Sequence, residues 1–174
     1  MKSVKLIGAA LAAAALLSAA TGNRQVTENA KSPSADTSMK VNGHDVIIEY
    51  NAPSARDRKV EGGLIPYGAI YRMGADAATT LTTDTDLMIG NLHVPKGVYT
   101  LYMMASENGP WELVVNKQTK QWGTVYNQAQ DLGRTPMKVT KLDSAVDKFK
   151  ITLASGMLSV EWGHTKATVP VKGM

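Results

Sequence analysis

The sequence contains no cysteine. This absence excludes disulfide bonds, a thiol nucleophile, a thiolate metal site and a lipidated N-terminal cysteine. The sequence also lacks a Gly-x-Ser-x-Gly elbow, a phosphate-binding P-loop, a His-Glu-x-x-His pair and a dinucleotide fingerprint. Beyond the first twenty residues no apolar run approaches the length of a transmembrane helix. These absences favour a binding protein over an enzyme, and they predict neither a cofactor nor a membrane span after the first twenty residues.

The chain also carries little net charge. Its 19 basic and 15 acidic residues give +4, and removal of Lys2 and Lys5 with a signal peptide would leave 17 minus 15, or +2. So small an excess does not indicate a nucleic-acid partner. The 154 residues left when 20 are removed from 174 are enough for one domain with its own core.

The first twenty residues have the three parts of a secretory signal peptide. Lys2 and Lys5 give a positive start, residues 6–17 are apolar, and Ser18 and Ala20 supply the small residues of a cleavage site. We therefore predict cleavage after Ala20 and export to the periplasm or the secreted space. The alternative is an N-terminal anchor that is retained. The polar residues 21–40 have no sustained period, and we predict a flexible leader there.

From residue 44 onward the apolar pattern has a period of two. Strict alternation of this kind predicts β-strands with one buried face. The predicted inward residues are Val46, Ile48 and Tyr50; Trp111, Leu113 and Val115; Phe149, Ile151 and Leu153; Leu158, Val160 and Trp162; and Ala167, Val169 and Val171. Pro170 indicates that the last strand lies at an edge, because proline cannot donate to a strand ladder.

Turn signals separate these strands. They are Gly90-Asn91, Pro95-Lys96-Gly97, Asn108-Gly109 and Ser155-Gly156. Only residues 127–132 suggest a helical turn. Short strands at a spacing of about ten residues predict an all-β fold. We expect a single antiparallel β-sandwich domain over residues 41–174, jelly-roll-like or of a related topology.

One long segment, residues 51–68, interrupts the strand pattern with glycines and prolines. Long loops of this kind are often functional. Leu64, Ile65 and Tyr67 indicate that it packs onto the body of the domain. Its charged cluster, residues 56–59, is interpreted most simply as a solvated loop.

Residues 47–172 resemble a bacterial family known only as the domain of unknown function numbered 2911. The resemblance rests on the segments Glu49-Tyr50-Asn51-Ala52-Pro53-Ser54, Gly63-Leu64-Ile65-Pro66-Tyr67-Gly68, Tyr71-Arg72-Met73-Gly74-Ala75-Asp76-Ala77-Ala78-Thr79-Thr80, Pro95-Lys96-Gly97-Val98-Tyr99-Thr100-Leu101, Trp111-Glu112-Leu113-Val114-Val115-Asn116-Lys117, Gln121-Trp122-Gly123 and Glu161-Trp162. It implies an exported β-rich domain and no particular activity. The usual central motif has Trp, Thr, Asn and Glu where this chain has Tyr71, Met73, Asp76 and Ala77. A role of that glutamate in relatives therefore cannot carry over.

The densest polar cluster is Arg72, Asp76, Thr79 and Thr80. An arginine beside a carboxylate could hold two sugar hydroxyl groups or a carboxylated ligand. The alternative is an internal Arg72–Asp76 pair that fixes a loop to the sheet. We predict that the two side chains interact and that the 51–68 loop borders the same pocket.

Trp122 and Tyr126 lie beside amide side chains, as aromatic residues do on carbohydrate-binding surfaces. The alternative is a tryptophan that closes one end of the fold. The predicted ligand-binding residues are thus Arg72, Asp76, Thr79, Trp122 and Tyr126, for a small-molecule or carbohydrate ligand.

Metal and catalytic candidates are weaker. His44, His93 and His164 have no ligand spacing, so no metal site is expected. Glu49 and Glu161 could act as an acid/base pair if their strands were neighbours, and the alternative is that each is a solvated partner of lysine.

The sequence thus predicts a non-enzymatic binding module of the bacterial envelope or secreted space. A hydrolase of envelope glycans or esters, using Glu49, Asp76 or Glu161, is the first alternative. A scaffold that binds another protein along its edge strand is the second. The oligomeric state stays open.

Overall fold

One antiparallel sheet of ten strands dominates the computed structural model, which describes residues 31–174. The predicted signal peptide and residues 21–30 of the predicted leader lie outside these residues. The strands are β1 Ser34–Val41, β2 His44–Asn51, β3 Ile70–Tyr71, β4 Thr80–Thr83, β5 Leu87–Ile89, β6 Leu92–Val94, β7 Gly97–Met104, β8 Trp111–Asn116, β9 Asp131–Ala154 and β10 Met157–Gly173. In the described part of the chain the single 3₁₀ turn, η1 Gln128–Gln130, is the only helical element. The predicted all-β, antiparallel, single-domain class is confirmed.

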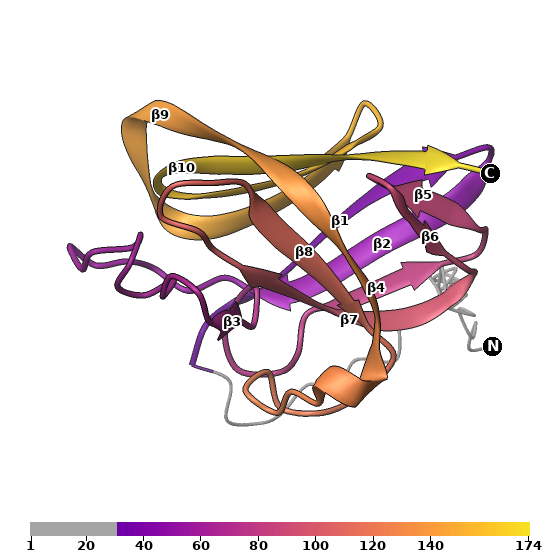
Figure 1. The fold of residues 1–174 in the computed structure, drawn as a ribbon, viewed down its shortest axis with the longest axis horizontal. Coiled ribbons are helices and arrows are strands. Elements are labelled where there is room, and N and C mark those ends of the chain that lie inside the picture. The colour runs from indigo at the N-terminus through magenta and orange to yellow at the C-terminus, as the bar shows by residue number, and fades with distance from the viewer. Residues whose placement is uncertain (1–30) are drawn as a thin grey trace, which may run out of the picture.

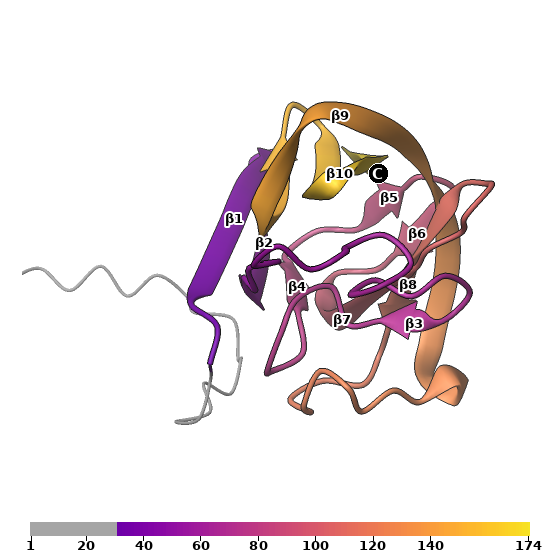
Figure 2. The same ribbon diagram turned by 90° about the vertical axis from the view of Figure 1, so that its left-hand side faces the viewer.

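The strand order is β1-β2-β4-β7-β8-β9-β10-β5-β6, and β3 pairs with β7. The sheet bends so that β9 and β10 lie across the core from β4 and β7 (Figures 1 and 2). Every inward residue predicted from the period-two pattern is buried, from Val46 and Ile48 on β2 to Val169 and Val171 on β10. Alternation fixes the buried face of a strand locally, and these faces meet in one core cluster.

The predicted turns fall at strand ends. Gly90-Asn91 joins β5 to β6, and Ser155-Gly156 joins β9 to β10 with positive φ at both residues. Residues 127–132, expected to form a helical turn, contain η1. In the 51–68 loop Ile65 is buried and Leu64 packs on the core, whereas Tyr67 is exposed.

Two local predictions differ from the structure. Residues 34–40 were assigned to the flexible leader, but they belong to β1, which pairs with β2 through a turn at Asn42-Gly43. Such an Asn-Gly dipeptide is itself a strong hairpin signal. The edge position inferred from Pro170 is wrong, because β10 lies between β9 and β5. Pairing with β9 ends at Thr168, so proline's missing N–H interrupts no β9 pair.

Backbone donors on the free side of β9 are satisfied by groups from the start of the domain. The amides of Phe149, Ile151 and Leu153 donate to Pro53 O (2.8 Å), Tyr50 Oη (3.1 Å) and Thr37 Oγ1 (2.9 Å). Tyr50 Oη also donates to Ile151 O at 3.4 Å. These alternate contacts bring β9 against β1 and β2, although the sheet path places β9 four pairings from β2.

We expect Tyr50→Phe to lower the free energy of unfolding by about 1–3 kcal/mol, because it leaves the buried Ile151 amide without an acceptor. Urea unfolding measures the loss. Tyr99→Phe is the matched control, since the Tyr99 hydroxyl donates to Pro95 O in a less enclosed place and no backbone amide depends on it. Equal losses in the two variants would contradict this role of Tyr50.

Candidate functional site

The predicted cluster at residues 72–80 forms a tight turn between β3 and β4. Met73, Gly74 and Asp76 all have positive φ, at 49°, 146° and 57°. A Cβ on Gly74 would lie 2.8 Å from the backbone oxygen of Asn51, so glycine is required here for space as well as conformation. The Gly74 carbonyl accepts from the Tyr71 hydroxyl at 3.1 Å and from Arg72 Nε at 3.2 Å. The hydrogen bond from Nε to the Gly74 carbonyl therefore holds the Arg72 side chain against this turn.

Asp76 is buried, and its carboxylate binds the N-terminal arm, residues 31–33. Its Oδ2 atom accepts from the amides of Lys31 (3.0 Å) and Ser32 (2.9 Å). Asn51 Nδ2 donates to Ser32 O at 2.7 Å, and the Ala52 amide donates to Pro33 O at 2.9 Å. Within residues 31–174 Arg72 and Asp76 form no ion pair, so the structure does not contain the predicted interaction. The reason is that the carboxylate faces the arm.

Thr79 and Thr80 support the turn from beneath. Thr79 is fully buried, and its hydroxyl donates to Met73 O at 2.7 Å. The Thr80 hydroxyl donates to Ala78 O at 3.3 Å. Thr79, a predicted ligand-binding residue, thus lies beneath the turn rather than in the lining of the cavities described below.

The structure brings the predicted Trp122–Tyr126 segment beside this turn. The Gly123 amide donates to Asp76 O at 2.8 Å, and the Ala78 amide donates to Gln121 O at 3.2 Å. A Cβ on Gly123 would lie 2.9 Å from Arg72 Cδ, so the arginine side chain passes over this glycine. Trp122 is 37% exposed, yet it lines neither of the two cavities that include Arg72.

A cavity of about 340 Å³ lies between the turn, the N-terminal arm and the 51–68 loop. The 51–68 loop thus borders a cavity that Arg72 also lines, as we predicted from the sequence. We call it the cationic cavity. Its charged lining residues are Lys31, Arg56, Arg58, Arg72 and Asp76, and Tyr71, Leu64 and Trp162 supply apolar surface. Four of these five charged side chains are cationic and one is a carboxylate, so positive charge prevails at the wall of the cavity.

The 51–68 loop is tied to β9 at the point where it carries its arginines. Asp147 accepts from the Ala55 amide through its carbonyl (2.8 Å) and from the Arg56 amide through Oδ1 (2.9 Å). Arg58 donates to Ala55 O and Ser54 O, at 2.8 and 2.9 Å. The Arg56 side chain and the terminal nitrogens of Arg72 have no polar partner among the described residues. Two guanidinium groups are thus available to a ligand.

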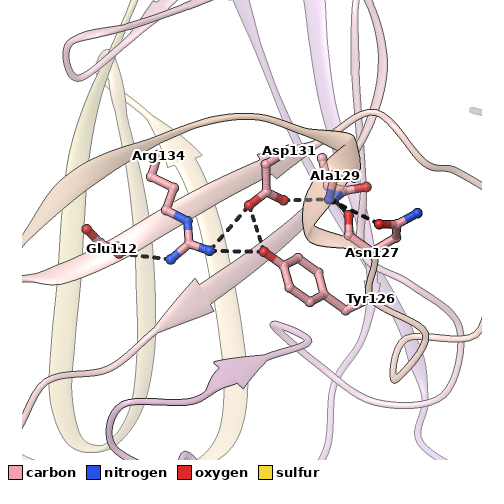
Figure 3. A network of polar contacts seen from close by, with 7 residues as sticks. Glu112, Tyr126, Asn127, Ala129, Asp131 and Arg134 are labelled. Carbon is pink, nitrogen blue, oxygen red and sulfur yellow. Dashed lines mark hydrogen bonds and ion pairs between the residues drawn. The ribbon is translucent and has the colours of Figure 1, made fainter.

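Tyr126 lies in the segment between β8 and β9 and belongs to a polar network with side chains of these two strands (Figure 3). Its hydroxyl donates to Asp131 Oδ2 at 2.6 Å and accepts from Arg134 at 3.0 Å. Arg134 also pairs with Asp131 at 3.3 Å and with Glu112 at 3.4 Å. Burial, followed by the hydrogen bond to Asp131, raises the pKa of the Tyr126 phenol. Of these four residues, sequence reasoning selected only Tyr126.

The proposed acid/base pair does not assemble. Glu49 lies on β2 and Glu161 on β10, and these strands are not neighbours in the sheet. The Glu161 carboxylate pairs with Lys166 at 2.8 Å. His93 contacts Asp86 at 3.2 Å, and no group of three or more His, Asp or Glu suited to a metal ion occurs in residues 31–174.

Sequence reasoning missed most of the cationic cavity. The sequence predicts a solvated loop at Arg56 and Arg58 and a core position for Trp162. Tyr71 is named only as part of the family resemblance. One signal in the sequence could have identified them: Arg56, Arg58 and Arg72 lie in two segments that were predicted to share a pocket.

None of the helical structure in residues 31–174 is long and apolar enough to cross a membrane.

Comparison with known proteins gives one match. A family model described as "Protein of unknown function (DUF2911)" matches residues 32–171. Neither the curated proteins nor the solved structures contain a match to this chain.

Proposed function

The chain belongs to the DUF2911 family of proteins of unknown function, and from its cationic cavity we propose that it is an exported binding protein for a small anionic ligand. The observation that carries this proposal is the pair of available guanidinium groups, Arg56 and Arg72, in one cavity. A guanidinium can bind a carboxylate or phosphate through two parallel hydrogen bonds, and such charge-assisted bonds are stronger than bonds between neutral groups.

The lining of the cavity favours binding over catalysis. Its one carboxylate, Asp76, already accepts from two backbone amides, and no histidine borders it among the described residues. Ser32 and Ser54 line the cavity, but among the described residues neither hydroxyl is hydrogen-bonded to a basic side chain that could activate it. Burial raises the pKa of the Tyr71 phenol far above neutrality, so this hydroxyl stays protonated. Export is supported by the signal-like pattern of residues 1–20.

Calorimetric titration at low ionic strength tests the proposal. The probes are propionate and inorganic phosphate, with propanol and propionamide as neutral counterparts. We expect the anions to bind and the neutral compounds not to bind. Arg56→Gln should weaken anion binding about tenfold, because it removes one of the two available guanidinium groups.

Lys138→Gln is the matched control. It removes one positive charge from an exposed position on β9 that does not line the cavity. If both variants weaken binding equally, the attraction comes from overall charge and the cavity is not the site. If propionate and phosphate both fail to bind at millimolar concentration, the proposed function is wrong.

A further inference from the structure

A second cavity, of about 450 Å³, adjoins the cationic cavity. The two share Leu64, Tyr71 and Arg72 in their linings. The remaining wall of the second cavity is formed by Pro66, Ile70, Tyr102, Gly123, Thr124 and Tyr126. Its volume is within the range of about 300–1,000 Å³ that is typical of small-molecule sites. We call it the tyrosine cavity.

The three tyrosines of this cavity have already used their hydroxyl protons. Tyr71 donates to Gly74 O at 3.1 Å, Tyr102 to Val125 O at 2.7 Å and Tyr126 to Asp131 Oδ2 at 2.6 Å. None of these phenols can therefore donate to a ligand without breaking an internal bond. Tyr102 is only 1% exposed, so the ring surface open to a ligand belongs to the half-buried Tyr71 and Tyr126. A wall that offers rings without free donors is poorly suited to a sugar, whose many hydroxyl groups need donors and acceptors together.

The rings are also fixed in place and uncharged. Tyr102 and Tyr126 meet edge to face with their centroids 5.0 Å apart. Burial raises the pKa of both phenols, so neither ring becomes an anion that would repel an acidic ligand. Edge-to-face packing is the geometry that aromatic rings prefer, and a further ring can add to such a cluster.

Arg72 connects the two cavities. Its Nε is held by Gly74 O at 3.2 Å and its Cδ lies over Gly123, while its terminal nitrogens have no polar partner among the described residues. Arg72 therefore belongs to the wall that the two cavities share. Arg56 lines only the cationic cavity, and Tyr102 and Tyr126 line only the tyrosine cavity.

We propose that the natural ligand is an aryl carboxylate, with its carboxylate at Arg56 and Arg72 in the cationic cavity and its aromatic ring in the tyrosine cavity. This inference rests on the proposed function for the position of the anionic group and extends it to the class of ligand. The commitment to a ring, rather than to a sugar, follows from the spent hydroxyl protons and the ring-lined wall.

The test compares 3-phenylpropionate with its two halves, propionate and 3-phenylpropanol, and with glucuronate, by calorimetric titration of the whole protein. We expect 3-phenylpropionate to bind at least about tenfold more tightly than propionate or 3-phenylpropanol. Thr124→Tyr places a bulky side chain at an exposed position in the tyrosine cavity. It should reduce the affinity for 3-phenylpropionate to that for propionate and leave propionate unchanged.

Gln128→Tyr adds the same side chain at an exposed position of η1 outside the cavity and should change neither affinity. If the ring adds nothing to propionate, or glucuronate binds more tightly than 3-phenylpropionate, this inference is wrong and the anion site stands. If 3-phenylpropanol binds as well as 3-phenylpropionate and Arg56→Gln has no effect, the tyrosine cavity binds a ring and the proposed anion site is wrong. If none of the probes binds at millimolar concentration, both are wrong.

Discussion

Trp162→Ala is expected to lower the free energy of unfolding by about 3–5 kcal/mol. Trp162 is only 3% exposed and packs against Phe149 with ring centroids 5.6 Å apart. Its Nε1 donates to Asp147 O at 2.7 Å, and the same carbonyl accepts from the Ala55 amide. Removal of the side chain leaves a cavity in the core and weakens the point where the 51–68 loop meets β9. Urea unfolding of the two proteins measures the difference.

Trp122→Ala is the control for this experiment, since the same residue type is 37% exposed there. Its loss should be within about 1 kcal/mol, as is usual for side chains outside the core. If the two variants lose equal stability, Trp162 does not hold the core together. The comparison also separates the core tryptophan from the one that the sequence assigned to a ligand surface.

The buried faces of the strands could be predicted because alternation is a local property. Val46 and Ile48 point inward for the same reason as Val160 and Trp162: each lies on the apolar side of a period-two run. The turn at Ser155-Gly156 is equally local, because a glycine between two alternating runs favours a turn, and the structure has positive φ at both residues.

Contacts between distant parts of the chain could not be predicted in this way. The Tyr50 hydroxyl meets β9 at Ile151, 101 residues further on, and no pattern within either strand specifies it. The prediction of an Arg72–Asp76 pair failed for a related reason. Residues close in sequence at a turn with positive φ can point in different directions, and Asp76 faces an arm 44 and 45 residues away.

The sequence predicted which segments border the candidate site, but not which of their side chains line it. The 51–68 loop and Arg72 do border one cavity, and Gly123 lies directly on the Arg72 turn. The contribution of Arg56 depends on how Asp147 holds its amide, which is a contact across 91 residues. The sequence alone therefore does not tell whether a charged loop cluster faces solvent or lines a cavity, because this depends on which distant residue holds the loop.

Asp76→Ala is expected to lower the free energy of unfolding by about 2–3 kcal/mol more than the matched variant Asp57→Ala. Both aspartates have positive φ, 57° and 60°, so alanine costs a similar backbone strain at either position. Only Asp76 holds the Lys31 and Ser32 amides, whereas the exposed Asp57 side chain makes no hydrogen bond to another described residue. The difference between the two variants therefore isolates the attachment of the arm.

Hydrogen exchange at the Lys31 and Ser32 amides gives an independent reading of the same contact. In Asp76→Ala both amides should exchange faster than in the native protein, and in Asp57→Ala they should not change. Asp76→Asn should fall between the two, because it keeps one oxygen to accept a hydrogen bond but loses the charge that strengthens it. Equal stability of Asp76→Ala and Asp57→Ala, with unchanged exchange at residues 31 and 32, would show that Asp76 does not hold the arm. The remaining contacts would then be sufficient: Asn51 Nδ2 to Ser32 O, and the Ala52 amide to Pro33 O at 2.9 Å.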